Sequence, residues 1–374
     1  MSPSNFDSFF ESPRGGFVES PRGARGGAIP AIVASGAFTT AGGDPATRVA
    51  QIPDVNGKWE ALGTGLNSNG NDVLTFNGKL YVVGSFTTAG GSSALRAASW
   101  DGSNWAALGT GLNGAANEMA IYDGKLAVAG TFNFAGGTLT NRIALWNGSS
   151  WSKLVPAEAA GGAPLLEVEA VYVDSSGNLW AGGFFDNAII GGVVTIRRIG
   201  YFDGTTWNEP GGGIPSAGGG RVRAIIEYDS DIWIGGNYSV TVGGVANTEH
   251  IARWDGSAWH AVKTSFTGTD IKAFAVYKGD LYAAGGFSSM NGVADTNNIA
   301  RWDGSAWHAV DVGFDNAVFD LLVSGNHLVA GGSFTQDGNT VSNYSRIAAW
   351  DGSSWTEVDD GTNSTVTALG LNEI

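Results

Sequence analysis

The sequence predicts an all-β protein, a seven-bladed β-propeller of four-stranded antiparallel blades whose ring is closed by the C-terminal strand joining the N-terminal blade. Three observations predict it. The stretch IARWDGSAWHAV occurs twice, letter for letter, at 251–262 and 299–310. Its core, an aromatic residue, Asp or Asn, Gly, two further residues and Trp, recurs along the chain. Glycine accounts for 59 of 374 residues, which indicates many turns between short strands.

The number of blades follows from the tryptophan that closes each copy of this core. Consecutive closing tryptophans are 46, 46, 56, 52, 48 and 48 residues apart. A repeat of about 40–50 residues that holds four short strands is typical of a propeller blade. The seven closing residues are Trp59, Trp105, Trp151, Trp207, Trp259, Trp307 and Trp355.

The second repeat shows the four strands in order. Runs rich in β-branched and aromatic residues lie at 72–76, 79–86, 96–100 and 105–109, and Gly, Asn or Asp bounds each run. Asn77-Gly78 between the first two runs is a strong hairpin signal, as are the Asp-Gly pairs between the last two. Each Trp-Asp-Gly-x-x-Trp hairpin is expected to set its two tryptophans opposite one another, for packing rather than for sugar stacking.

The two ends of the chain complement each other. The first repeat contains only the last three strands, at 31–38, 47–52 and 58–62. The missing innermost strand is supplied by 364–372, and its pairing with the N-terminal strands would remove an open sheet edge. We therefore divide the chain into an extended arm, residues 1–29, and a propeller, residues 30–374.

Composition excludes several classes of function. The chain has no cysteine, so disulfides, thiolate metal sites and a cysteine nucleophile are excluded. The N-terminus has no apolar signal region, and no apolar run is long enough to insert into a membrane. A net charge of −15 argues against nucleic-acid binding.

The repeats resemble the Kelch and galactose-oxidase type of propeller, in a divergent form. The resemblance covers roughly residues 30–374 and is carried by NGKLYVVGSF…RAASWDGSNWAAL and by glycine doublets. These repeats are also similar to those of bacterial extracellular propellers and fungal cortical cell-polarity markers. The resemblance implies the fold but no activity, and the copper site of galactose oxidase needs a cysteine that this chain lacks. The doublets are Gly182-Gly183, Gly235-Gly236, Gly285-Gly286 and Gly331-Gly332.

Long, variable loops gather on one face of the predicted disc, where binding sites are common. Polar residues are expected at the start of the innermost strands on that face, around the mouth of the channel. Their mixed charges suggest mutual pairing rather than a catalytic carboxylate pair, and the channel mouth is the best-placed pocket for a small ligand. These candidate binding residues are Asp72, Glu118, Glu169, Arg223, Lys272 and Asp320.

A second set of polar residues occupies the start of the third strand in each blade. Arginine stands there in five of seven copies, with His250 and Asn298 in the other two. We favour a structural role, in which each guanidinium holds loop carbonyls, and a ring that binds anions is the alternative. The five arginines are Arg48, Arg96, Arg142, Arg198 and Arg346.

Catalytic and metal-binding patterns are missing from the sequence. The four histidines are dispersed, and no two of them have the spacing of metal ligands. No cofactor is expected. Loops such as NGVADTNN and DDGTN contain oxygen ligands that could hold Ca²⁺, but they do not match a specific calcium-binding motif. We therefore predict that the protein is not an enzyme.

The arm, residues 1–29, differs from the repeats because it contains ESPRG twice among phenylalanines and arginines. We expect it to anchor the protein to a large assembly, most simply a phage virion, with the long-loop face turned outward toward a host receptor or surface glycan. The alternatives are an extracellular bacterial adhesin or glycan-binding propeller, and a lyase or glycosidase acting at the channel mouth. The candidate anchoring residues are Phe9, Phe10, Arg14, Phe17, Arg22 and Arg25.

Overall fold

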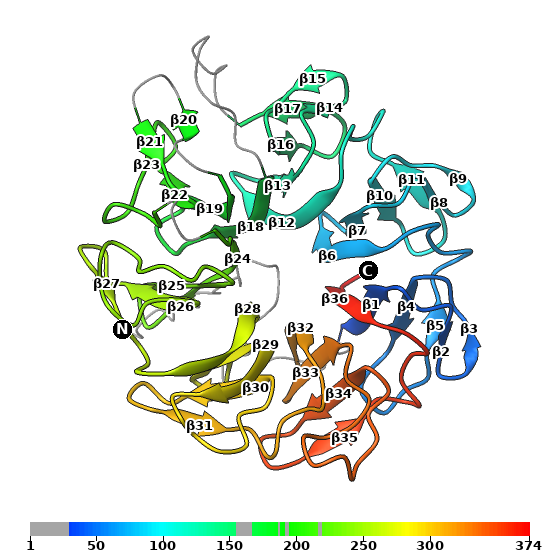
Figure 1. The fold of residues 1–374 in the computed structure, drawn as a ribbon. Coiled ribbons are helices and arrows are strands. Elements are labelled where there is room, and N and C mark those ends of the chain that lie inside the picture. The colour runs from blue at the N-terminus through cyan, green and yellow to red at the C-terminus, as the bar shows by residue number, and fades with distance from the viewer. Residues whose placement is uncertain (1–29, 155–166, 186–187, 191–193, 216–218) are drawn as a thin grey trace, which may run out of the picture.

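The computed structural model describes residues 30–154, 167–185, 188–190, 194–215 and 219–374. They form seven four-stranded antiparallel sheets arranged in a ring (Figure 1), which confirms the predicted fold class. None of these residues lies in a helix, so none of them belongs to a helix that could cross a membrane.

Within each blade the strands follow one another from the centre of the ring outward. Blade 1 consists of β36 (Val366–Asn372), β1 (Ala31–Gly36), β4 (Val49–Ile52) and β5 (Glu60–Ala61). Blade 2 consists of β6 (Gly70–Phe76), β7 (Lys79–Gly84), β10 (Ala97–Trp100) and β11 (Trp105–Ala107). Blade 3 consists of β12 (Ala116–Tyr122), β13 (Lys125–Gly130), β16 (Ile143–Trp146) and β17 (Trp151–Lys153). Blades 4 and 5 consist of β18 (Glu167–Val173), β19 (Leu179–Phe184), β22 (Ile199–Phe202) and β23 (Trp207–Asn208); and β24 (Val222–Tyr228), β25 (Asp231–Gly236), β26 (Ile251–Trp254) and β27 (Trp259–His260). Blades 6 and 7 consist of β28 (Phe266–Tyr277), β29 (Asp280–Met290), β30 (Ile299–Trp302) and β31 (Trp307–Ala309); and β32 (Val318–Ser324), β33 (His327–Gly332), β34 (Ile347–Trp350) and β35 (Trp355–Glu357).

The C-terminal strand closes the ring as the sequence predicts. β36 pairs antiparallel with β1, from Ala31 opposite Asn372 to Gly36 opposite Val366. Figure 1 shows this red strand against the blue first strand of the chain. Closure leaves each blade between two neighbours, so every innermost strand has a packed surface on both sides.

The cross-strand tryptophan pairs form as predicted. Trp254 lies opposite Trp259 across the outer hairpin, with 5.3 Å between ring centroids. The closing tryptophan also has a second partner: the Trp259 indole donates a hydrogen bond to the carbonyl of Pro210, in the segment before blade 5, at 2.9 Å. Such a bond contributes about 1 kcal/mol in addition to the buried ring area. Equivalent bonds are made by Trp59, Trp105, Trp151, Trp307 and Trp355.

The loops between second and third strands are more regular than the sequence suggests, because four contain a small hairpin. In blade 1, Gly42 and Gly43 both have positive φ, at 57° and 82°, as a tight turn between two-residue strands requires. The four hairpins are β2 (Thr40–Ala41) with β3 (Asp44–Pro45), β8 (Thr88–Ala89) with β9 (Ser92–Ser93), β14 (Phe134–Ala135) with β15 (Thr138–Leu139), and β20 (Ala188–Ile190) with β21 (Val194–Ile196).

Blade 6 departs from the other blades in length. Its inner strands β28 and β29 have 12 and 11 residues, whereas β6 and β7 of blade 2 have 7 and 6. The extension runs to Phe266 and Met290, on the side of the long loops. The innermost hairpin of this blade therefore reaches further toward that face than its counterparts.

Candidate functional site

Every innermost strand has a β-bulge close to the face that carries the long loops. In blade 2 the pairing passes from Gly70–Gly84 to Asp72–Val83 and leaves Asn71 without a partner in register. We call the seven residues at this position the bulge ring. Its members are Thr367, Asn71, Asn117, Glu169, Arg223, Lys272 and Phe319.

Glycine on the second strand makes room for the bulge. A Cβ atom on Gly84 would lie 2.2 Å from the carbonyl oxygen of Asn69, closer than any side chain tolerates. This close approach explains one glycine of each doublet in the sequence, because the same position is glycine in all seven blades. The seven are Gly36, Gly84, Gly130, Gly183, Gly236, Gly285 and Gly332.

The prediction of a single channel-mouth ring needs correction, because the six predicted residues occupy two different positions relative to the bulge. Asp72, Glu118 and Asp320 follow the bulge and are 8%, 8% and 7% exposed. Glu169, Arg223 and Lys272 are bulge residues that line a cavity instead. The bulge inserts one residue into the strand, so the simple alternation used to align the repeats assigns neighbouring positions to one ring.

The three carboxylates after the bulge tie adjacent blades together. Asp72 accepts a hydrogen bond from the backbone N–H of Met119 in blade 3, with 2.7 Å between Oδ2 and N. Glu118 accepts one from Val171 in blade 4 at 2.9 Å. Charged acceptors that are buried and bonded to backbone in this way stabilise the ring rather than a ligand.

Neutral members of the bulge ring also bond to the next blade. Asn71 donates from Nδ2 to the carbonyl of Ala116 at 2.8 Å, and Asn117 donates to Val168 at 3.0 Å. Thr367 donates to the carbonyl of Gly70 at 2.7 Å. Blades 1, 2 and 3 therefore use the bulge residue to hold the neighbouring blade.

Blades 4, 5 and 6 carry charged residues at this position, and these belong to a chain of alternating charges that we call the ion-pair ladder. On each innermost strand or just before it, two charged residues stand two positions apart, so both face the channel. The ladder runs Glu167, Arg221, Glu169, Arg223, Asp270, Lys272.

The contacts within the ladder are close at its ends and long at its centre. Arg221 lies 2.9 Å from Glu167 and also donates to Glu169. Lys272 Nζ lies 2.7 Å from Asp270 Oδ2. The Nε atom of Arg223 lies 3.7 Å from both Glu169 and Asp270, beyond hydrogen-bond distance.

Burial distinguishes Arg223 from the two carboxylates beside it. The Arg223 side chain is 31% exposed, whereas those of Glu169 and Asp270 are 12% and 7% exposed. Burial raises the pKa of the Glu169 carboxyl above its ordinary value, although Arg223 and Arg221 act in the opposite direction.

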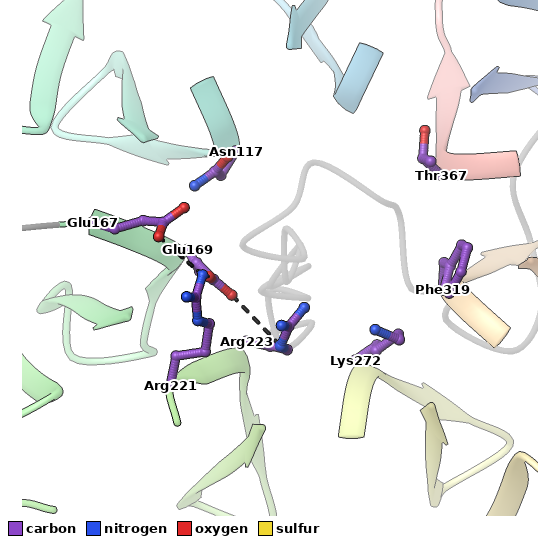
Figure 2. A pocket seen from close by; sticks show the side chains of 8 residues that line it. All are labelled: Asn117, Glu167, Glu169, Arg221, Arg223, Lys272, Phe319 and Thr367. Atoms are coloured by element: carbon purple, nitrogen blue, oxygen red, sulfur yellow. Dashed lines mark hydrogen bonds and ion pairs between the residues drawn. The ribbon is translucent and has the colours of Figure 1, made fainter. Parts of the chain in front are cut away.

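A cavity of about 380 Å³ lies over the ladder at the mouth of the channel (Figure 2). This volume lies within the range of small-molecule sites. Figure 2 shows the guanidinium of Arg223 extending into it from the start of β24, and the Phe319 ring standing across from it near Lys272. Lys272 Nζ lies 5.1 Å from the centroid of that ring. The lining residues are Asn117, Glu167, Glu169, Arg221, Arg223, Lys272, Phe319 and Thr367.

The sequence missed five of these eight residues: Asn117, Glu167, Arg221, Phe319 and Thr367. The glycine of the second strand, repeated in every copy, was the available signal, because it marks the position of the bulge and therefore the residue that faces the channel.

Three of the five arginines at the start of the third strand, Arg48, Arg96 and Arg198, bond to segments between blades. Arg96 donates from Nη1 to the carbonyl of Leu112 at 2.8 Å, and Arg48 donates to the side chain of Asn69 at 2.6 Å. Arg142 and Arg198 donate to the carbonyls of Thr131 and Gly219. Their backbone was not anticipated: all five have positive φ, between 61° and 79°, a left-handed conformation that residues other than glycine seldom adopt. The five are Arg48, Arg96, Arg142, Arg198 and Arg346.

Within the described ranges, no group of three or more His, Asp or Glu side chains is placed to hold a metal ion. In the DDGTN loop, Asp359 instead accepts a hydrogen bond from the backbone of Trp59 and lies 3.2 Å from Lys58. The candidate anchoring residues Phe9, Phe10, Arg14, Phe17, Arg22 and Arg25 lie outside the described residues.

Comparison with known proteins supports a β-propeller family and does not confirm the Kelch or galactose-oxidase type. A family model described as a domain of unknown function (DUF5122) beta-propeller matches residues 77–98 and 123–145. No curated protein matches the sequence significantly.

Several solved structures are similar in fold. The structure of YjhT is 14% identical over 79% of this chain and 99% of its own, with a TM-score of 0.47. XC5397 from Xanthomonas campestris, named a gluconolactonase, is 13% identical over 83% and 96%, with a TM-score of 0.43. A putative 6-phosphogluconolactonase from Bacteroides fragilis is 10% identical over 91% and 97%, with a TM-score of 0.44.

The prediction that the chain is not an enzyme is wrong as an exclusion. Propellers of this general arrangement include proteins named as lactonases, so the lack of a familiar catalytic motif does not rule out catalysis. Those names describe the other proteins, and at such low identity the likeness concerns the fold alone.

Proposed function

We propose that this chain is a ligand-binding propeller that takes a small, hydroxyl-rich ligand, such as the end of a glycan, in the cavity at the channel mouth over blades 4 to 6. One observation carries the proposal. The bulge residues of blades 1 to 3 bond to the next blade, whereas Glu169, Arg223 and Lys272 turn charged groups toward a cavity. A departure from a repeated pattern at one cavity is where function is expected on a repeat scaffold.

The lining supports a sugar-like ligand. Arg221, Arg223 and Lys272 can donate hydrogen bonds, and Glu167 and Glu169 can accept them from hydroxyl groups. Phe319 offers an aromatic surface for the apolar face of a pyranose ring. Donors, acceptors and one aromatic in a cavity of about 380 Å³ suit a mono- or disaccharide.

The test is to measure binding of a panel of monosaccharides and short glycans to the full chain and to two variants. Phe319→Ser removes the aromatic from the cavity, and Phe134→Ser removes a 43% exposed aromatic in β14, outside the cavity. We expect at least one sugar to bind, a tenfold or greater loss of affinity in Phe319→Ser and no change in Phe134→Ser. Equal effects of the two substitutions, or no binding by any sugar, would overturn the proposal.

We also propose that residues 1–29 attach the propeller to a large assembly, most simply a virion, and that the long-loop face is presented to a host receptor or glycan. The support is the composition of the arm, where two ESPRG copies stand among phenylalanines and arginines. An extracellular protein is the alternative location.

Sedimentation of native protein from its source material tests this attachment. Full-length chain should sediment in a megadalton fraction, and a chain lacking residues 1–29 should remain at the size of free protein. Both forms sedimenting as free protein would contradict the attachment, and the cavity would then be the principal functional feature.

A further inference from the structure

The two arginines are the most exposed side chains of the ion-pair ladder, and Glu169 and Asp270 are the most covered. Arg221 and Arg223 are 30% and 31% exposed and Lys272 is 20% exposed. Of the carboxylates, Glu167 is 25% exposed, and those of Glu169 and Asp270 are almost covered. Of the charged residues that line the cavity, three are cations and two are carboxylates, so the lining carries an excess of one positive charge although the chain as a whole carries a net charge of −15.

Arg223 is the ladder cation least committed to a protein partner. Its Nε atom is buried and has no hydrogen-bond acceptor within the part of the chain that the structure describes. Both neighbouring carboxylates stay 3.7 Å away, whereas Arg221 and Lys272 have partners at 2.9 and 2.7 Å. Because this Nε atom is buried, a ligand in the cavity would reach the guanidinium through its terminal N–H groups.

The net charge of the ion-pair ladder favours a ligand with a single negative charge. The ladder has three cations and three carboxylates, so it is neutral before a ligand arrives. A monoanion beside Arg223 adds one negative charge close to a guanidinium that has no short ion pair. A dianion would add a second negative charge next to Glu169 and Asp270, and like charges at such distances repel.

We infer that the ligand of this cavity is a sugar acid, with its single carboxylate on Arg223 and its hydroxyl groups among the polar residues of the lining. A guanidinium presents two parallel N–H groups that match the two oxygens of a carboxylate. This inference rests on the proposed function, since it names the class of ligand for the same cavity. Acidic residues of a surface glycan and free sugar acids share this chemistry.

The experiment compares sugars that differ only in the carboxylate. Glucuronate and glucose, and galacturonate and galactose, are titrated calorimetrically into the full chain at constant ionic strength. We expect each acid to bind at least tenfold more tightly than its neutral counterpart. Arg223→Gln should bring the ratio of acid to neutral-sugar affinity close to one, even if the loss of its N–H donors also weakens binding of the neutral sugar. Arg253→Gln is the matched control, because Arg253 pairs with Asp231 between the second and third strands of blade 5 and does not line the cavity.

The outcomes separate the inference from the proposed function. Equal binding of acid and neutral sugars, or a preference that survives in Arg223→Gln, overturns the inference and leaves the proposed function in place. Failure of all four sugars and of the wider glycan panel overturns both. Arg223→Lys guards against a folding defect: it keeps the charge but not the paired N–H groups, and should retain only part of the preference if the carboxylate is held as inferred.

Discussion

The carboxylate of Asp320 accepts a hydrogen bond from the backbone N–H of Leu369, with 2.8 Å between Oδ2 and N. Leu369 lies in β36, the strand that the C-terminus contributes to blade 1, so the bond ties blade 7 to the strand that closes the ring. The other oxygen accepts the N–H of Leu321, also at 2.8 Å. Because the side chain is only 7% exposed, water cannot readily replace it.

Asp320→Ala is therefore expected to destabilise the propeller. It leaves two buried N–H groups without this acceptor, and the free energy of unfolding should fall by about 1–3 kcal/mol. Urea denaturation of the full chain measures the change. Glu60→Ala, which removes an exposed carboxylate in β5, is the control and should stay within about 0.5 kcal/mol of the parent protein. Equal losses in the two variants would contradict a special role for Asp320.

The indole hydrogen bonds of the closing tryptophans predict that a Trp→Phe substitution lowers the free energy of unfolding more where the tryptophan is more deeply buried. Trp307 is 2% exposed and donates to the carbonyl of Val262 at 2.8 Å. Trp307→Phe should cost roughly 1–3 kcal/mol in unfolding free energy, because the buried carbonyl loses its donor. Trp105 makes the equivalent bond to Leu62, also at 2.8 Å, but is only partly buried. Trp105→Phe should cost less, and the reverse order in thermal unfolding would refute the explanation.

The outer hairpin turns predict how stability depends on pH. Hydrogen bonds from the Ser353 hydroxyl and from the N–H groups of Ser354 and Ser353 lower the pKa of Asp351 to about 2. The pKa of an unfolded aspartate is about 3.9. The folded state therefore holds fewer protons between these values, and the stabilisation is complete above about pH 4 and is lost as the pH falls toward 2.

Asn147 provides a control for this prediction, because it accepts the same two turn N–H groups in blade 3 with a side chain that does not titrate. Asp351→Asn should keep the turn and make the free energy of unfolding less steep between pH 4 and pH 2. Denaturation curves at several pH values in that range measure the slope. An unchanged slope would show that this turn does not contribute to acid sensitivity.

Binding of a sugar acid should strengthen as the pH is lowered into the range in which Glu169 takes up a proton. Burial raises the pKa of Glu169, and protonation of that carboxyl would remove a negative charge beside the bound carboxylate. Glu167, Asp270, Arg221, Arg223 and Lys272 are the other charged groups of the ladder, and His250, near Asp270, has a pKa lowered by burial. Glu169→Gln should flatten the profile of glucuronate affinity against pH. A profile that is equally steep in this variant would assign the effect to another group.

The number of blades, the four strands of each, the outer tryptophan pairs and the closure of the ring could all be predicted from the amino-acid sequence. This is possible because these features repeat: turn residues such as Asn77-Gly78 and the closing tryptophans recur at a nearly constant interval. Local propensity and periodicity are sufficient when each unit faces the same neighbours.

Which polar residues face the channel, by contrast, depends on the folded arrangement of the strands. Asp72 and Asn71 are neighbours in sequence, yet one is buried against blade 3 and the other occupies the bulge ring. The bulge shifts the strand by one residue and exchanges its two faces, and alternation along the strand does not reveal that shift. The ladder itself joins residues about 50 positions apart, such as Glu169 and Arg223, which come together because successive blades present the same strand to one channel.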